Sequence, residues 1–244
     1  MLVLGIDTAT PWGTVALYKG HPDGNGEVVF EISLRAGRGG GEYLLSTVNH
    51  FIQKAGHGFK ELDLIAAGTG PGSYTGIRVG LAAVKGMAEG LQKPVWGMNT
   101  LRIIAENARF SGNRFIGTAI DARRGQVYSA LFRNTGDGLE EVREPRVTSV
   151  KEFAAELERF TPVVICGDGS KVYRDIWDLC PVMTGPNDWD RPSAGKLAQI
   201  AAKEWKPGLQ SNLTELKACY LRRVEAEIRL EENLHAIQRQ PHDD

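Results

Sequence analysis

Residues 2–18 read Leu-Val-Leu-Gly-Ile-Asp-Thr-Ala-Thr-Pro-Trp-Gly-Thr-Val-Ala-Leu-Tyr, and this stretch decides the fold. An apolar run ends in Asp7, a turn-forming Pro-Trp-Gly follows at residues 11–13, and a second β-forming run begins at Thr14. Two such runs around a short turn predict an antiparallel hairpin. A further run at residues 28–32 follows a loop with Gly, Pro and Asn, so the chain is expected to begin as a three-stranded meander.

A related pattern restarts at residues 115–132, which read Phe-Ile-Gly-Thr-Ala-Ile-Asp-Ala-Arg-Arg-Gly-Gln-Val-Tyr-Ser-Ala-Leu-Phe. Here too an apolar run ends in an aspartate, Asp121, and a turn leads into a second β-forming run. We interpret the two stretches as an internal duplication. The sequence therefore predicts two related halves.

Apolar periodicity predicts alternating helices and strands after each hairpin. The first copy has the order βββαβαβ, and the second copy is similar but less complete. The expected elements of the first copy after the meander are a helix at 42–54, a strand at 64–67, a helix at 75–91 and a strand at 95–98. Those of the second copy are a strand at 142–147, a helix at 150–159, a strand at 163–166 and a helix after 167–170. Further helices are expected at 193–206 and from about residue 216 onward, and residues 240–244 are expected to fray.

Residues 68–86 combine a glycine-rich turn with a helix that has one small and one apolar face. The glycines of the turn permit backbone angles closed to other residues, and Ser73 or Thr75 is expected to cap the helix. Interior glycines cost a helix about 1 kcal/mol each relative to alanine, so the small face predicts that a second backbone comes near. The apolar face is Ile77, Leu81, Val84, Met87 and Leu91, and the small face is Gly76, Gly80, Ala83 and Gly90.

A glycine loop at a helix start raises the question of phosphate binding, because free amides there attract anions. A P-loop needs a lysine and a hydroxyl residue directly after its last glycine, but Ile77 and Arg78 follow Gly76. A dinucleotide-binding fingerprint needs a third glycine where this chain has Ser73 or Thr75. Both motifs are excluded. Two interpretations stay open, a ligand site of another kind and a tight turn with a closely packed helix.

The composition is that of an ordinary globular chain, with 244 residues, 42% hydrophobic and 24% charged, and a formal net charge of −1. Such a charge argues against a free-standing nucleic-acid binder, so contact with RNA is expected to need a partner. No apolar run approaches the ~20 residues of a membrane span and no cleavable leader is evident, so we expect a cytoplasmic protein without a membrane partner. The cysteines Cys166, Cys180 and Cys219 have no metal or disulfide spacing and are expected to be buried free thiols.

Three further motifs, together with the duplicated strand-Asp-turn-strand pattern, carry a resemblance to a known family. They are Gly70-Pro-Gly-Ser-Tyr-Thr-Gly-Ile-Arg-Val-Gly80, Asp121-Ala-Arg-Arg-Gly-Gln-Val-Tyr128 and Cys219-Tyr-Leu-Arg222. The duplication resembles the actin-like ATPase and sugar-kinase fold, an α/β fold in which two ribonuclease-H-like halves, each a mixed sheet flanked by helices, hold a nucleotide between them. With the motifs, the chain resembles the bacterial TsaB (YeaZ) family. The lobes expected are 1–104, which carries the partner-binding helices, a smaller degenerate lobe at 105–215, and a C-terminal helix and frayed tail at 216–244.

The resemblance implies an accessory role in tRNA modification. Proteins of this family work with the homologous TsaD catalytic subunit and the TsaE ATPase to place threonylcarbamoyl on adenosine 37 (t6A) of tRNAs that read codons beginning with A. They are regarded as non-catalytic scaffolds. The implied partners are TsaD, TsaE and a second copy of the chain, with tRNA only through the complex. No cofactor is expected to bind stably to this chain alone, whereas ATP or ADP and a metal are compatible with the complex.

The first turn holds candidates for a vestigial nucleotide site. Asp7, Thr8 and Thr10 resemble the first phosphate motif of the fold, in which an acidic residue orients hydrated magnesium and hydroxyls approach phosphate. The alternative, that Asp7 only caps the turn after its strand, has equal weight. The full candidate set is Asp7, Thr8, Thr10, Gly70, Gly72 and Ser73.

Groups that catalysis would need are missing elsewhere. A nucleotide-binding member carries Asp-x-Gly and a hydroxyl residue in the second half, but this chain has Asp121-Ala-Arg123. His50 and His57 do not form the closely spaced histidine pair of the family's catalytic subunits, so no metal ligand is predicted. No sequence motif pairs Ser73 with a histidine that could act as its base. No catalytic residue is therefore predicted.

The two helices of the first lobe are the expected partner interface. In this family they pack against the equivalent pair of a second protein, a role that would explain the small face, with Tyr74 and Arg78 as anchors. The alternative is that these residues serve only the internal core. The family usually has a histidine and a serine before the first helix, where this chain has Arg-Gly-Gly-Gly-Glu at residues 38–42. The predicted interface residues are Tyr43, Leu44, Val48, Tyr74, Gly76, Arg78, Gly80 and Ala83.

Two functions of different classes follow from these observations. One is a non-catalytic scaffold of the TsaD subunit. The other is a stand-alone nucleotide-dependent kinase or hydrolase of the same fold, including the older glycoprotease label of the wider family. The missing second phosphate motif favours the scaffold, while Asp7 keeps nucleotide binding open.

Overall fold

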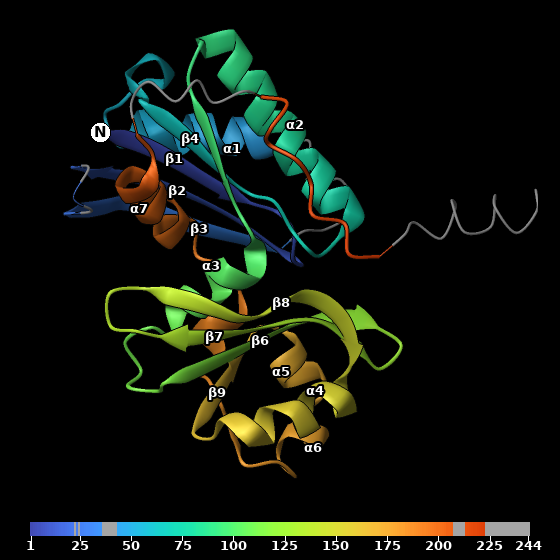
Figure 1. Cartoon of the computed structure of the whole chain (residues 1–244). Coiled ribbons are helices and arrows are strands. Elements are labelled where there is room, and N and C mark those ends of the chain that lie inside the picture. The colour runs from blue at the N-terminus through green and yellow to red at the C-terminus, as the bar shows by residue number, and fades with distance from the viewer. Residues whose placement is uncertain (22, 24, 36–42, 207–212, 223–244) are drawn as a thin grey trace, which may run out of the picture.

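The computed structural model describes residues 1–21, 23, 25–35, 43–206 and 213–222, which form two five-stranded mixed sheets, one above the other in Figure 1. In the first sheet β1 lies at the centre, antiparallel to β2 and parallel to β4. Every residue of β1 is buried, as expected of a strand with both faces covered. The strand order is β3 (Gly26–Arg35), β2 (Trp12–Gly20), β1 (Leu2–Asp7), β4 (Leu64–Gly68) and β5 (Val95–Met98).

The second sheet repeats the topology of the first. Its central strand β6 is antiparallel to β7 and parallel to β9, as β1 is to β2 and β4. The predicted α/β fold with two related mixed sheets is thus confirmed, although the short edge strand β10 was not predicted. The strand order is β10 (Val182–Thr184), β9 (Val163–Cys166), β6 (Phe115–Arg123), β7 (Gln126–Asn134) and β8 (Leu139–Ser149).

Two helices, α1 (Leu44–Lys54) and α2 (Tyr74–Leu91), cover one face of the first sheet. Apolar side chains spaced at the helical period, such as Val48, Ile77 and Val84, pack there against β1, β2 and β4. The predicted cap of α2 is confirmed, because Ser73 Oγ accepts a hydrogen bond from the Gly76 amide at 3.2 Å. A short 3-10 turn, η1 (Phe59–Glu61), precedes β4.

The second sheet is covered on one face by shorter helices. Ser149 and Glu152 form a capping box at the start of α4, and Phe153 and Trp177 meet edge to face in the core beneath. The elements are α4 (Val150–Leu157), α5 (Gly169–Val172) and α6 (Arg174–Trp177), with 3-10 turns η2 (Glu158–Phe160) and η3 (Asn187–Asp190).

One helix from each half packs against the sheet of the other half. The helix α3 (Thr100–Asn107) follows β5 of the first sheet, but it packs against β6 and β7 of the second through Leu101, Ile104 and Ala105. The helix α7 (Ala194–Glu204) follows the second sheet, but it packs against β1, β2 and β4 of the first. The sequence did not predict α3. The expected lobe boundaries at residues 104 and 215 stay a prediction: residue 104 lies within α3, and α7, which precedes residue 215, packs on the first sheet.

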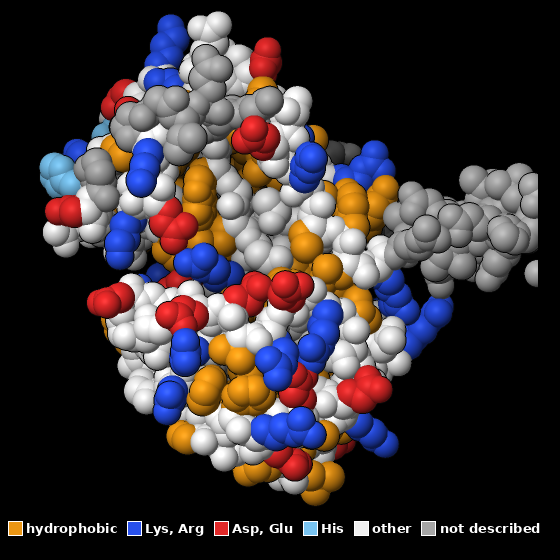
Figure 2. All heavy atoms as spheres, in the orientation of Figure 1, with side chains coloured by type: hydrophobic (Ala, Val, Ile, Leu, Met, Phe, Trp, Pro, Cys, Tyr) orange, Lys and Arg blue, Asp and Glu red, His pale blue; other side chains and the backbone are white. Residues whose placement is uncertain are grey.

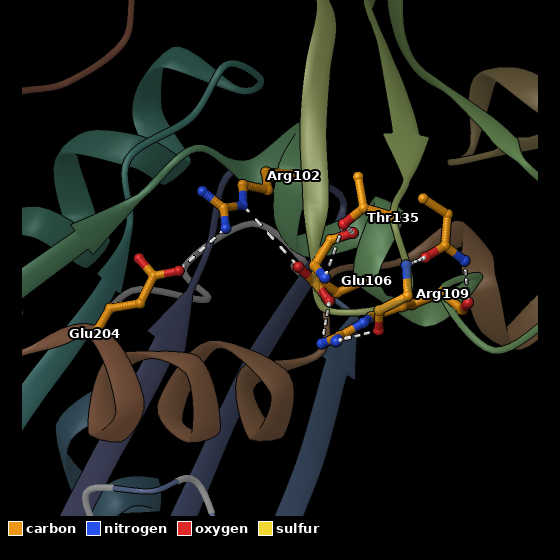
Figure 3. A network of polar contacts seen from close by, with 8 residues as sticks. Arg102, Glu106, Arg109, Thr135 and Glu204 are labelled. Atoms are coloured by element: carbon orange, nitrogen blue, oxygen red, sulfur yellow. Dashed lines mark hydrogen bonds and ion pairs between the residues drawn. The ribbon is translucent and has the colours of Figure 1, made fainter.

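Polar contacts reinforce this junction (Figure 3). Arg102 of α3 reaches Glu204 of α7, with 3.1 Å between Nη2 and Oε1. On its other side Arg102 lies 4.0 Å from Glu106, which Arg109 also approaches at 3.9 Å. Burial raises the pKa of the Glu106 carboxyl, and the two arginines oppose that rise. The charged groups of α3 thus face both halves of the chain.

The C-terminal part of the described chain corrects one prediction. The helix expected from about residue 216 is absent from residues 216–222, which instead form an extended segment beside α2. We call residues 213–222 the strap. The rest of that predicted helix, the fraying expected at 240–244 and the departure from the family pattern at 38–42 lie outside the described residues. Within the described part of the chain, no helix combines the length and apolarity needed to cross a membrane.

We expect the core between α7 and the first sheet to be needed for stability. Leu197 is 0% exposed there, so Leu197→Ala should lower the free energy of unfolding by about 2–5 kcal/mol. Urea unfolding measures this change. Leu179, which is 87% exposed, is the matched control, and Leu179→Ala should stay within about 0.5 kcal/mol of the parent. Equal effects of the two substitutions would contradict the packing of α7 described above.

Candidate functional site

Asp7 ends β1 and its side chain is completely buried. Its Oδ1 accepts a hydrogen bond from the Ala9 amide at 2.8 Å, and its Oδ2 accepts one from the Thr100 hydroxyl at 2.7 Å. Gly68 lies against the carboxylate so closely that a Cβ atom there would overlap it. Burial raises the pKa of Asp7 from 3.8 to about 6, although both hydrogen bonds act in the opposite direction. Groups of the chain itself therefore surround this carboxylate.

The glycine-rich loop packs directly on the turn that follows Asp7. The Ser73 amide donates to the Ala9 carbonyl at 2.6 Å, and the Thr8 hydroxyl donates to the Gly76 carbonyl at 2.7 Å. Gly72 faces the Ala9 carbonyl, and any side chain at this position would collide with it. The loop and the turn thus form one packed unit, for which the glycines are required by close backbone approach.

The six candidate nucleotide contacts are therefore partly brought together, but their polar groups bond to other residues of the chain, such as Ala9, Gly76 and Thr100. The Gly70 amide donates to Thr100 Oγ1 at 3.1 Å, while Thr10 turns to the Trp12 carbonyl at 2.9 Å. Asp7 caps its own turn through the Ala9 amide, as the second interpretation of this residue requires. Nucleotide contact by this set stays a prediction.

The equivalent turn of the second half is closed in a similar way. Asp121 Oδ1 accepts the Arg123 amide at 2.8 Å, as Asp7 accepts Ala9, and it also accepts the Tyr173 hydroxyl at 2.8 Å. The Asp121 amide donates to Asp168 Oδ1 at 2.9 Å, and burial raises the pKa of Asp168. Arg123 and Arg124 both have positive φ. These two residues lie at the turn, and Arg123 also pairs with Asp121, with 3.1 Å between Nη1 and Oδ2.

The strap connects the two turns. Near the first, the Cys219 amide donates to the Thr69 carbonyl at 2.8 Å, and the buried Leu216 packs at Gly97. At the second, Arg222 donates to the Ala122 carbonyl at 2.9 Å and to Gln126 Oε1 at 3.1 Å. The segment Cys219-Tyr-Leu-Arg222 thus joins the end of β4 in the first half to the end of β6 in the second.

One face of α2 is exposed over its whole length. Residues Tyr74, Arg78, Ala82, Gly86 and Gly90 are exposed at intervals of four along it, and we call them the α2 face. At its start the Tyr74 ring lies 5.0 Å from the ring of Tyr220 in the strap, and Arg78 donates to the Tyr74 hydroxyl at 2.8 Å. Figure 2 shows hydrophobic side chains gathered where the strap crosses this end of α2.

The predicted interface residues divide by exposure. Tyr43, Tyr74 and Arg78 are exposed, and Gly76 and Ala83 are half-buried. Leu44, Val48 and Gly80 are buried within the chain itself, Leu44 and Val48 in the core between α1 and the first sheet. These three positions are corrected to internal packing residues, because they have no surface left for a partner.

The small face of α2 also has an internal explanation at two positions. A Cβ atom at Gly76 would overlap the Thr8 carbonyl, and one at Gly80 would overlap the Thr8 hydroxyl. The small face led us to expect that a second backbone comes near the helix. At these two positions that backbone is the turn after Asp7 in the same chain. At Gly86 and Gly90, in contrast, an added Cβ atom would meet no atom of the described residues within 4 Å. Only these two glycines remain without an internal reason.

Several residues of these sites were not singled out from the sequence. Thr100 bonds both Asp7 and Gly70, but it lies in a helix that the periodicity did not reveal. Ala82 and Gly86 follow Tyr74 and Arg78 at intervals of four, so the helical spacing from those two anchors would have found them. Among the described residues, no three His, Cys, Asp or Glu side chains gather as metal ligands would.

The raised pKa of Asp7 predicts a specific pH dependence of stability. The folded chain holds this proton more tightly than the unfolded chain, so the stability it contributes is present below pH 3.8 and is lost as the pH rises to about 6. Asp7→Asn cannot ionise. Relative to the parent, its free energy of unfolding should rise by about 2–3 kcal/mol between about pH 4 and about pH 7.

Urea unfolding of both proteins across this pH range measures the difference. Asp190 also has a pKa raised to about 6 by burial, but it is present in both proteins and cancels in the comparison. If the difference in free energy of unfolding between the two proteins does not change with pH, then ionisation of Asp7 does not destabilise the fold and this prediction is wrong.

The two kinds of glycine in α2 predict opposite effects of alanine. Gly86→Ala should stabilise the chain by about 1 kcal/mol, because it adds helix propensity in open space. Gly76→Ala should destabilise it by about 1–3 kcal/mol, because the new methyl group meets the Thr8 carbonyl. Thermal unfolding of the pair tests this. If both substitutions raise the unfolding temperature, the close packing of loop and turn is wrong.

Comparisons with known proteins agree with this architecture. The model of the family described as TsaD, tRNA N6-adenosine threonylcarbamoyltransferase, matches residues 35–229. The tRNA threonylcarbamoyladenosine biosynthesis protein TsaB of Escherichia coli is 28% identical over 91% of this chain and 95% of its own length. The TsaB protein of Bacillus subtilis is 33% identical over 48% of this chain and 51% of its own length.

Solved structures give the same result. YeaZ from Pseudomonas aeruginosa superposes with a TM-score of 0.75 at 27% identity, over 90% of this chain and 99% of that one. A second crystal structure, described as an uncharacterized protein with similarity to peptidase YEAZ from Pseudomonas aeruginosa, has a TM-score of 0.76 at 27% identity, over 91% and 99%. The chain therefore belongs to this family, as one of the TsaB (YeaZ) proteins of tRNA threonylcarbamoyladenosine biosynthesis, and it has an actin-like ATPase type of fold.

Proposed function

We propose that the chain is a non-catalytic accessory subunit that binds and activates the TsaD catalytic subunit during threonylcarbamoylation of tRNA. The observation that carries this proposal is the state of Asp7. Its two oxygens accept hydrogen bonds from Ala9 and Thr100, and Gly68 and Gly72 leave no space around the turn. A carboxylate held in this way is poorly placed to orient a hydrated magnesium ion.

The position of the strap supports the same conclusion. In a nucleotide-binding member of this fold, the ligand lies between the two halves at the ends of their central strands. Here Cys219 bonds to Thr69, which directly follows β4 beside the central strand of the first sheet, and Arg222 bonds to Ala122 near the end of β6, so the chain's own segment bridges the two halves at this edge. Any ATP, ADP or metal of the reaction is therefore assigned to the complex with TsaD and TsaE, and not to this chain alone.

The α2 face is the proposed docking surface for TsaD, and alternatively for a second copy of the chain. Small residues at Ala82 and Gly86 allow a second helix to approach closely, and the Tyr74–Tyr220 pair with Arg78 supplies an aromatic and cationic anchor. Tyr43 and Leu45 of the neighbouring α1 segment, 66% and 48% exposed, extend the apolar surface. Because TsaD and a second copy use the same face, the two bind in competition.

The experiment measures t6A formation on unmodified tRNA by purified TsaD and TsaE with ATP, threonine and bicarbonate, with and without this chain. We expect modification to depend on the chain. Ala82→Arg should lower affinity for TsaD by about 100-fold or more, because it places an unpaired charge in the centre of the interface, and t6A formation should fall with it. Ala155→Arg, the same change at an exposed position of α4, should leave both unchanged.

The outcomes separate the two functions considered. If t6A forms equally well without the chain, the accessory role is wrong and a stand-alone nucleotide-dependent enzyme becomes the better explanation. If the chain is required but Ala82→Arg binds TsaD normally, the role stands and the α2 face is not the docking surface.

A further inference from the structure

Phe110 is an exposed aromatic residue with two cations near its ring. It follows α3, and 78% of its surface is exposed. The Arg109 guanidinium lies 5.4 Å from the centre of its ring, and the Lys196 ammonium of α7 also lies 5.4 Å from it. Because α7 packs on the first sheet and α3 on the second, this ring stands where the two halves meet.

A second ring with a cation lies close by. The Arg191 guanidinium is 5.2 Å from the ring of Trp12, and the Arg191 carbonyl accepts a hydrogen bond from Asn107 at 2.9 Å. Asn107 is the last residue of α3 and precedes Phe110 by three residues. We call Trp12, Arg191, Lys196, Phe110 and Arg109 the aromatic-basic strip.

The cations of the strip are near three carboxylates, two of which are mostly buried. Burial raises the pKa of Glu106, whose side chain is 4% exposed, and Arg109 and Lys196 both oppose that rise. Arg191 is 3.4 Å from Asp188, which is 88% exposed, and it opposes the rise that burial causes in the pKa of Asp190, whose side chain is 15% exposed. Asp188 is therefore the one well-exposed carboxylate among these three.

We infer that the aromatic-basic strip contacts unpaired nucleotides of the tRNA when the chain is in its complex. The exposed Phe110 ring, with the half-buried Trp12 ring nearby, offers a stacking surface to bases of any sequence, and cations beside the rings attract the phosphates between those bases. A protein partner is favoured less, since a cation lies within 5.4 Å of the centre of each ring. The inference rests on the proposed function, which brings tRNA to the complex.

The test uses the assembled complex of this chain with TsaD and an end-labelled unmodified tRNA transcript, with binding followed by fluorescence anisotropy. Phe110→Leu keeps an apolar side chain but removes the flat ring, so it should weaken tRNA binding about tenfold. Phe110→Trp keeps a ring and should bind as tightly as the parent. This pair separates base stacking from docking of an apolar protein surface, which accepts leucine.

The charge of the strip is tested by salt dependence. Lys196→Gln should reduce the slope of log affinity against log salt by about 0.7–0.9, the effect of one phosphate contact. Lys151→Gln, the same change at an exposed position of α4, should leave the slope unchanged.

The inference is overturned if Phe110→Leu binds tRNA like the parent, or if it weakens assembly with TsaD while the assembled complex still binds tRNA normally. The latter result would show a protein interface. Failure of the proposed function is seen separately, in t6A formation that does not require the parent chain, and it would remove the basis of this inference as well.

Discussion

The hydrogen bond from the Thr100 hydroxyl to the buried Asp7 carboxylate holds three parts of the first half together. Asp7 ends the central strand, Thr100 begins the helix that crosses to the second sheet, and Gly70 of the glycine loop donates to the same hydroxyl. The cost of burying a carboxylate is visible in its raised pKa. Because α3 starts at this point, the same bond fixes where the first half ends and how α3 enters the second half.

The residues that most resemble a phosphate site thus serve the fold. The hydroxyl of Thr8, the amide of Ser73 and both oxygens of Asp7 all have partners within the chain. These polar groups are therefore satisfied within the chain and are not free to bind a phosphate. What remains available to other molecules lies on the outside, on the α2 face and the aromatic-basic strip.

Local patterns predicted the strands other than β10, the duplication and a hydroxyl cap at Ser73 or Thr75, because each depends on residues close in sequence. The exchange of α3 and α7 was not predictable, since periodicity shows that a helix has a buried face but not which sheet buries it. The same limit explains Leu44 and Val48, whose apolar spacing fitted an interface and a core equally. The strap was mistaken for a helix because its extended form is held by distant partners, Thr69 and Ala122.

The strap also relates the α2 face, the proposed docking surface, to the second half. Tyr220 packs on Tyr74 at the start of the α2 face, and two residues later Arg222 is bonded to Ala122 and Gln126 of the second sheet's turn. A partner that covers Tyr74 and Tyr220 therefore contacts a segment anchored in both halves. The packing of α3 on the second sheet and of α7 on the first, with the Arg102–Glu204 ion pair between them, also joins the halves. The α2 face accordingly presents one preformed surface, in which little conformational entropy is left to lose on binding.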